Sequence, residues 1–213
     1  IEEPLIIFKE GNKKTRTNRV EELIELVGLD SCHKNRYPHE LSGGQRQRVV
    51  IARALALNPK FLICDEPIAA LDVSIQAQII NLLKHLQNKL NLTYLFISHD
   101  LSIVKYLSDR VAVLYLGQII EFSPADELYD NPLHPYTKAL FSAISIPNLK
   151  TEQKSSRIIL KGEMPSFQTP ITGCPFANRC PNSSHHCISE KPKETHYPTG
   201  HSVNCHLYTD LSA

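Results

Sequence analysis

Two glycines that follow a serine, in the stretch Leu41-Ser42-Gly43-Gly44-Gln45, could place backbone N–H groups around a phosphate. A run with helical periodicity comes next, so we predict that Ser42 caps a helix. Helix N-termini expose unpaired N–H groups and a partial positive charge, and glycines let a phosphate approach closely. The Ser42 hydroxyl adds one more donor. A plain helix cap with a flexible turn would use the same residues, so the surrounding sequence must decide between the two interpretations.

A second group of polar residues follows two apolar segments. Asp65 and Glu66 come directly after Phe61–Cys64, and His99 follows Thr93–Ile97. We predict that both segments are strands buried on both faces of a parallel sheet. Ligand sites of α/β proteins lie at the carboxyl ends of such strands, and an acid there helps to hold Mg²⁺ in nucleotide hydrolases. A solvated acid pair and a structural histidine are the alternatives.

The elements that must position these residues alternate between strands and helices. Residues 1–18 are polar and lack a clear pattern. Apolar periodicity and capping residues predict helices over 19–28, 42–58, 73–90 (with Asp72 as the cap) and 101–107. Short apolar runs predict strands over 61–64, 93–97, 110–116 and 119–122. This alternation predicts an α/β fold with a mostly parallel sheet and flanking helices.

The order and spacing of these residues, from about Val20 to Asp109, resemble the ATP-binding subunits of ABC transporters. The resemblance implies that Ser42–Gln45 form the signature loop of a helical region. This loop contacts ATP held by a second, head-to-tail subunit. It also implies that Asp65 helps to hold Mg²⁺ beside that ATP.

The same resemblance implies roles for three further residues. Glu66 would polarise the attacking water, and His99 would contact the γ-phosphate and sense its loss. Asp72 would be the acid of the D-loop, which faces the partner subunit, and it can cap a helix at the same time. The family more often has Ser where this chain has Ala69, so the fine tuning of hydrolysis is open to change here.

One element of that family is missing from the sequence. The P-loop reads G-x-x-x-x-G-K-[ST], and none of the 8 glycines is followed by Lys. In the family this loop lies upstream of the signature, whereas this chain opens with Ile1. We therefore expect these residues to be the C-terminal part of a longer subunit. We expect the chain alone to carry half of an ATP site and to be inactive.

The remaining chemistry lies in a tail that we predict to be a small Cys-rich domain. We predict an ATPase part over residues 1–145, a linker over 146–157 and the tail domain over 158–213. Of the 6 cysteines, four cluster in the tail with C-x5-C-x6-C-x17-C spacing, namely Cys174, Cys180, Cys187 and Cys205. Four thiolates can hold one Zn²⁺ or one [4Fe–4S] cluster, and a metal-free tail is the third possibility.

The segment Pro132-Leu133-His134-Pro135-Tyr136-Thr137 and the cysteine-bearing tail narrow the resemblance to the ATPases of oligopeptide and dipeptide importers. Nickel and some oligosaccharide importers belong to the same group. The resemblance favours an iron–sulfur cluster over zinc. The partners it implies are an identical or paralogous ATPase subunit, transmembrane permeases and, indirectly, an extracytoplasmic solute-binding protein. It also implies a peripheral location on the cytoplasmic face of the membrane.

Composition narrows the alternatives. The formal net charge of +1 gives no reason to expect nucleic acid as a partner. No apolar run approaches the roughly 20 residues that span a bilayer. A soluble ABC ATPase of DNA repair or translation is disfavoured, because we find neither a long coiled-coil insert nor paired ATPase halves. A truncated, non-catalytic remnant is the other alternative. The sequence does not name the transported solute.

Overall fold

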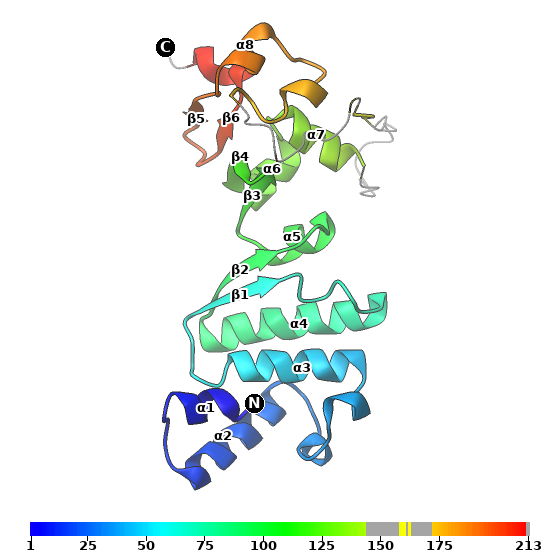
Figure 1. The fold of residues 1–213 in the computed structure, drawn as a ribbon, viewed down its shortest axis with the longest axis vertical. Coiled ribbons are helices and arrows are strands. Elements are labelled where there is room, and N and C mark those ends of the chain that lie inside the picture. The colour runs from blue at the N-terminus through cyan, green and yellow to red at the C-terminus, as the bar shows by residue number, and fades with distance from the viewer. Residues whose placement is uncertain (144–157, 161, 163–171, 212–213) are drawn as a thin grey trace. The chain divides into compact units, whose positions relative to one another are not determined.

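The computed structural model describes residues 1–143, 158–160, 162 and 172–211. The chain forms two compact units, Ile1–His99 and Asp100–Ala213 (Figure 1). In the described parts of both units, no helix has the length and apolar character to cross a membrane.

The first unit combines helices with one pair of strands. Its helical segments are α1 (Glu3–Ile7), α2 (Lys13–Leu26), η1 (Ser31–His33), η2 (Pro38–Glu40), α3 (Gly43–Ala54) and α4 (Val73–Leu90). Helix α3 packs between α2 and α4, and the three helices are stacked in this order (Figure 1). Their shared core contains side chains with at most 7% exposure, including Leu23, Val27, Ile51, Ala52, Ile79 and Leu83.

Two of the predicted helices have different ends in the structure. Helix α2 begins at Lys13 rather than residue 19, because the Asn12 side chain accepts the Thr15 N–H and caps an earlier turn. Residues 1–18, which show no clear pattern in the sequence, therefore contain α1 and the first turns of α2. Helix α3 ends at Ala54, short of the predicted Asn58.

Strands β1 (Phe61–Asp65) and β2 (Thr93–Ile97) form a parallel pair in which Asp65 lies opposite Ile97. The predicted burial on both faces is wrong: Phe61 is 52% exposed and Ile63 is 59% exposed. The Tyr94 hydroxyl donates to the backbone oxygen of Leu83 on α4, so that helix covers one face of the pair. Within the described residues, the other face remains open, and uniformly apolar sequence could not distinguish the two faces.

The second unit is built on an antiparallel sheet in the order β3-β4-β6-β5. Its strands are β3 (Arg110–Tyr115), β4 (Gln118–Pro124), β5 (Glu194–His196) and β6 (Ser202–Asn204). Its helices are α5 (Leu101–Leu107), α6 (Ala125–Asp130), α7 (Pro135–Ser142), η3 (Ala177–Arg179), α8 (His185–Ser189) and η4 (His206–Leu211). The predicted mostly parallel sheet is thus observed only for β1 and β2, because β3 and β4 form a hairpin through Gly117, whose φ is +75°.

A buried polar cluster joins β4 to the tail. The Glu121 carboxylate accepts the N–H of Leu133 (2.6 Å), the N–H of His134 (3.0 Å) and a hydrogen bond from His201 Nε2 (2.8 Å). The side chains of Glu121 and His201 are 0% and 2% exposed. A buried carboxylate is tolerated only when it is paired and hydrogen-bonded, and these three donors meet that condition.

Aromatic packing completes the core of this unit. The Phe176 side chain, from the tail, is fully buried. Its ring lies 5.3 Å from that of Tyr115, 5.4 Å from that of Tyr136 and 5.7 Å from that of His134, measured between centroids. The tail therefore packs on β3 and on the start of α7.

Candidate functional site

The predicted phosphate loop forms the start of α3. Ser42 is its N-cap: the Ser42 Oγ accepts the Gln45 N–H (3.2 Å), and the Ser42 N–H donates to Gln45 Oε1 (2.9 Å). This reciprocal pair is a capping box, so both side chains are fixed relative to the helix. The first N–H groups of α3 are arranged to meet an anion.

The two glycines have different surroundings. A Cβ at Gly43 would lie 3.3 Å from Leu71 Cδ2, whereas a Cβ at Gly44 would lie 2.7 Å from Ile75 Cγ2 on α4. Gly44 is therefore required for the close packing of α3 against α4. Sequence reasoning treated both glycines as phosphate contacts and missed this packing role.

The acid pair lies at the carboxyl end of β1. Glu66 has a φ of +43°, an uncommon conformation for a residue with a side chain. Its N–H donates to the backbone oxygen of Ile97 (3.0 Å), and its Oε1 lies 3.0 Å from His99 Nδ1. The structure thus brings together two predicted catalytic residues that are 33 positions apart, and both side chains are at least half exposed. Asp65 is exposed beside them.

The loop that follows the acid pair is held in place by hydrogen bonds. Asp72 caps α4 by accepting the Ser74 hydroxyl (2.7 Å) and the Ile75 N–H (3.0 Å), and these bonds hold the pKa of its carboxyl below the usual value. The Gln76 side-chain amide donates to the backbone oxygens of Ile68 (3.2 Å) and Leu71 (3.0 Å). Gln76 was missed by sequence reasoning, since no pattern marks a residue that braces a loop from the helix behind it.

The four tail thiols lie near one another. Burial and the neighbouring thiols raise the pKa of Cys174 and Cys180 and raise that of Cys205 to about 11. Nearby backbone N–H groups act in the opposite direction on these three pKa values. The Ser184 hydroxyl lies 3.4 Å from the Cys187 sulfur.

The spacing of these thiols bears on what they can hold. Among the described residues, the group of three donors whose ligand atoms all lie within 4.8 Å is Asp30, Cys32 and His33, not any three of the tail cysteines. A single ion draws its ligands that close together. A [4Fe–4S] cluster keeps its cysteine sulfurs farther apart, because each sulfur binds a different iron. Four thiolates can hold either one Zn²⁺ or one [4Fe–4S] cluster.

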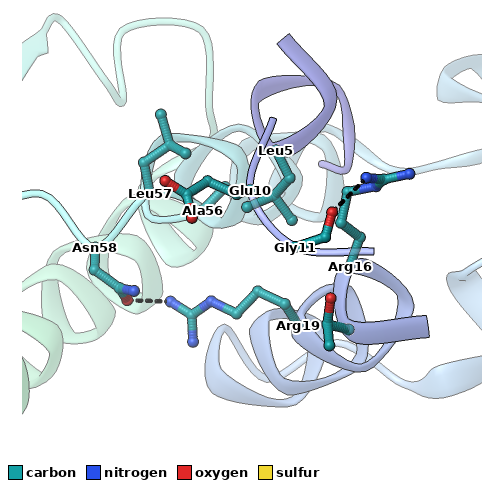
Figure 2. Close-up of a pocket in the computed structure, with 9 residues that line it drawn as sticks. Leu5, Glu10, Gly11, Arg16, Arg19, Ala56, Leu57 and Asn58 are labelled. Carbon is teal, nitrogen blue, oxygen red and sulfur yellow. Dashed lines mark hydrogen bonds between the residues drawn. The ribbon is translucent and has the colours of Figure 1, made fainter. Parts of the chain in front are cut away.

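A cavity of about 280 Å³ lies between α1, α2 and the end of α3 (Figure 2). The Arg16 guanidinium in its wall donates to the backbone oxygen of Gly11 (2.9 Å), and that of Arg19 donates to Asn58 Oδ1 (2.5 Å). Both bonds join neighbouring segments of the unit. None of the predicted site residues lines this cavity, and its arginines serve the fold.

Comparisons with known proteins agree with this geometry. Residues 2–69 match the ABC transporter family, and residues 120–187 match the oligopeptide/dipeptide transporter C-terminal region. The chain is 52% identical over 98% of its length to the oligopeptide transport ATP-binding protein AppF of Bacillus subtilis, of which it covers 64%. It is 49% identical over 96% of its length to the oligopeptide transport ATP-binding protein OppF of Escherichia coli, of which it covers 61%. The chain thus spans less than two thirds of these relatives.

Among solved structures, the chain is similar to the dimeric bacterial ABC transporter cassette MJ0796, with a TM-score of 0.51 and 34% identity over 58% of this chain and 54% of that one. It is similar, with a TM-score of 0.52, to the dimeric post-hydrolysis state of MJ0796 bound to ADP and Pi. The part of the chain that these structures cover thus has the α/β fold of an ABC cassette. The chain is thus similar over nearly its whole length to oligopeptide transport ATP-binding proteins, with one part that matches the ABC transporter family and one that matches the oligopeptide/dipeptide transporter C-terminal region.

Proposed function

We propose that this chain forms part of the ATP-hydrolysing subunit of an importer for oligopeptides or dipeptides. The observation that carries the proposal is the pairing of Glu66 with His99 at the carboxyl end of β1. An acid paired with an imidazole at this edge of a sheet suits the orientation of water beside a γ-phosphate. A nickel or oligosaccharide importer is the alternative within the same group.

The proposed mechanism divides the reaction between two subunits. The start of α3, with Ser42 as its cap, meets the phosphates of an ATP held by the P-loop of the opposing subunit. Mg²⁺, when bound, would neutralise charge on the phosphates, and Asp65 is the residue that would hold it. Glu66 orients the attacking water, and His99, whose Nδ1 faces Glu66, has its Nε2 left for the γ-phosphate. Asp72 lies on the loop that faces the partner.

The importer setting follows from that division. The second ATPase subunit is identical or paralogous, and the pair acts on transmembrane permeases at the cytoplasmic face of the membrane. A solute-binding protein delivers the peptide outside. We expect the intact subunit to co-purify with its permeases. Recovery of a soluble ATPase without permeases would contradict this setting.

The role of the acid pair is tested by Glu66→Gln in a polypeptide that joins this chain to a P-loop segment. We expect ATP to bind with unchanged affinity, because the amide keeps the size of the side chain. Turnover falls by about 10²–10⁴-fold, the range for loss of a general base. The exposed residue Glu25 on α2 supplies the control, Glu25→Gln, which leaves turnover intact. Equal turnover in the two proteins would refute the role of Glu66, whereas no turnover even in the parent would favour a non-catalytic remnant.

We further propose that Cys174, Cys180, Cys187 and Cys205 hold a [4Fe–4S] cluster that stabilises a Cys-rich domain over residues 158–213. The ATPase part would cover 1–145, and the proposed linker, 146–157, lies outside the described residues. The support is the C-x5-C-x6-C-x17-C pattern of the four cysteines and the electrostatic influence of their thiols on one another.

This assignment predicts about four irons and four acid-labile sulfides per chain after anaerobic purification. Replacement of Cys180 by Ser removes them, whereas the same change at Cys64, a lone buried thiol, does not. If the parent protein contains zinc instead of iron, and the Cys180 variant lacks that zinc, the four cysteines hold Zn²⁺. If the protein contains neither iron nor zinc, the four thiols are ordinary side chains and the cluster assignment is wrong.

A further inference from the structure

The signature glutamine has a hydrogen-bond partner outside the signature. The Oε1 atom of Gln45 already accepts the Ser42 N–H, so the amide orientation is fixed and its NH₂ group points away from the cap. That NH₂ nitrogen lies 3.0 Å from His33 Nε2. His33 is the last residue of η1, in the segment that leads from α2 to α3.

These contacts assign the tautomer of the imidazole. An amide nitrogen can only donate, so His33 Nε2 must be the acceptor and carry no proton. The ring proton therefore sits on Nδ1, which lies 3.0 Å from the backbone oxygen of Asp30 and donates to it. The Cys32 sulfur lies farther from Nδ1, at 3.8 Å. The Asp30 backbone, His33, Gln45 and Ser42 are thus joined in a single chain of hydrogen bonds.

The start of this chain of hydrogen bonds is anchored as well. Asp30 caps η1 by accepting the Cys32 N–H (2.7 Å), and its carboxylate also accepts a hydrogen bond from the Cys32 thiol. Asp30, Cys32 and His33 are close enough to act as metal ligands. However, both nitrogens of His33 and the carboxylate of Asp30 are already used by partners within the chain, which favours a hydrogen-bond relay over a metal site.

We propose that His33 is a positioning residue for the signature loop. By accepting from the Gln45 amide, it keeps the amide oxygen on the Ser42 N–H and so holds the cap in place before the nucleotide arrives. The Ser42 Oγ accepts the Gln45 N–H. The hydrogen of the Ser42 hydroxyl can therefore be donated to another acceptor, such as a phosphate oxygen. Preorganised donors stabilise transferring phosphates because they need no rearrangement during the reaction. This inference rests on the proposed ATPase function.

The relay is tested directly in the chain by NMR of its imidazole nitrogens. Two-bond ¹H–¹⁵N correlations distinguish a ring protonated at Nδ1 from one protonated at Nε2, and a His33→Gln variant assigns the signal among the 10 histidines. We expect the Nδ1–H form for His33. The Nε2–H form, or an even mixture of both, would overturn the relay. Stoichiometric Zn²⁺ could instead shift the His33 signal in the parent but not in Cys32→Ser. That result would show a metal site at Asp30, Cys32 and His33 and would overturn the relay.

A pair of substitutions then tests positioning in an ATP-hydrolysing assembly that contains this chain together with a P-loop. Gln at position 33 can offer an oxygen where Nε2 lies, whereas Asn reaches only to the place of Nδ1. We expect His33→Asn to lower kcat about fivefold, the effect of one net hydrogen bond, with little change in KM. His33→Gln restores kcat to within about twofold of the parent.

Two further variants separate the possible failures. His39→Asn, in the same segment, removes a ring that stacks on Tyr37, and it leaves kcat unchanged if the effect is specific to position 33. Ser42→Ala reports on the signature itself. If Ser42→Ala abolishes turnover and His33→Asn does not lower it, the positioning role is wrong and the proposed function stands. If neither substitution lowers kcat, the proposed function of the loop is wrong, and the positioning role of His33 is wrong with it.

Discussion

Two glutamates of this chain have different roles because their side chains differ in exposure to solvent. Glu66 and Glu121 are both glutamates next to a histidine. The Glu66 carboxylate is half exposed and has one imidazole partner, so it can still act on a ligand. Glu121 is fully buried and accepts three N–H groups, so its carboxylate is closed to solvent and held by partners within the fold. Burial, not residue type, separates the candidate catalyst from the structural acid.

His134 gives a prediction at this scale. Burial, with a smaller contribution from Lys138, lowers its pKa to about 4, and its Nδ1 accepts the Tyr136 N–H at the start of α7. The folded pKa lies below the unfolded value of about 6.5. The neutral ring therefore stabilises the fold fully above pH 6.5, and this contribution is lost as the pH falls from 6.5 through 4.

Urea unfolding between pH 7 and pH 4.5 measures the loss. We expect the His134 contribution to the free energy of unfolding to fall by about 2–3 kcal/mol over this range. His134→Asn keeps an acceptor for the Tyr136 N–H but cannot titrate, so its stability should fall less steeply with acid. Parallel pH profiles for the two proteins would show that His134 is not the titrating group.

At the scale of elements, the contact between α3 and α4 limits what the signature can vary. A methyl group at Gly44 would lie 2.7 Å from Ile75 Cγ2, which is attached directly to a stiff, β-branched centre. We expect Gly44→Ala to destabilise the first unit by about 1–3 kcal/mol despite the better helix propensity of Ala. Thermal unfolding checks this value.

The neighbouring glycine is the matched control. At Gly43 the added methyl group would meet the flexible end of Leu71 at 3.3 Å, so Gly43→Ala should unfold near the parent temperature. The additional change Ile75→Ala should remove most of the clash that Gly44→Ala creates. If Gly44→Ala alone is as stable as the parent, the two helices do not pack as closely as described.

The sequence predicted elements better than it predicted their surroundings. The cap at Ser42, the cap at Asp72 and the strand that ends at Asp65 are each encoded within a few residues, and the structure has all three. The exposed face of β1 and the antiparallel pairing of β4 with β6 depend on which segments meet in space. A local pattern contains no information about such contacts.

The same limit applies to the candidate site. The acid pair and His99 could be predicted because their residue types and spacing form a known pattern. His33 and Gln76 could not, since each acts through a hydrogen bond to another segment and any of several polar side chains would look similar in sequence. Contacts of this kind become visible only when the fold is known.

Across the whole molecule, the unit Asp100–Ala213 depends on contacts between segments that lie far apart in the chain. The Glu121–His201 pair joins residues 80 positions apart, next to the pairing of Glu121 with Val203 in the sheet. Removal of the charge on Glu121 leaves His201 and two backbone N–H groups without a full acceptor. We expect Glu121→Gln to destabilise this unit by about 3–5 kcal/mol, as for other broken buried pairs.

Limited proteolysis and denaturant unfolding measure this effect. The matched control is Glu127→Gln, since the Glu127 Oε1 lies 3.8 Å from His201 Nδ1 and its side chain is 32% exposed. Its effect should stay below about 1 kcal/mol, the usual value of a solvent-accessible pair. Similar losses in the two variants would mean that burial does not set the strength of the interaction.

The pairing of β4 with β6 also has a consequence for biosynthesis. Residues 80 positions apart must both leave the ribosome before Glu121 meets His201. At a synthesis rate of about 5–20 residues per second, one edge of β4 stays unpaired for roughly 4–16 s on every translating ribosome. An open strand edge can pair with another nascent chain, so the yield of folded protein should depend on translation speed and on chaperones that bind β4 during this interval.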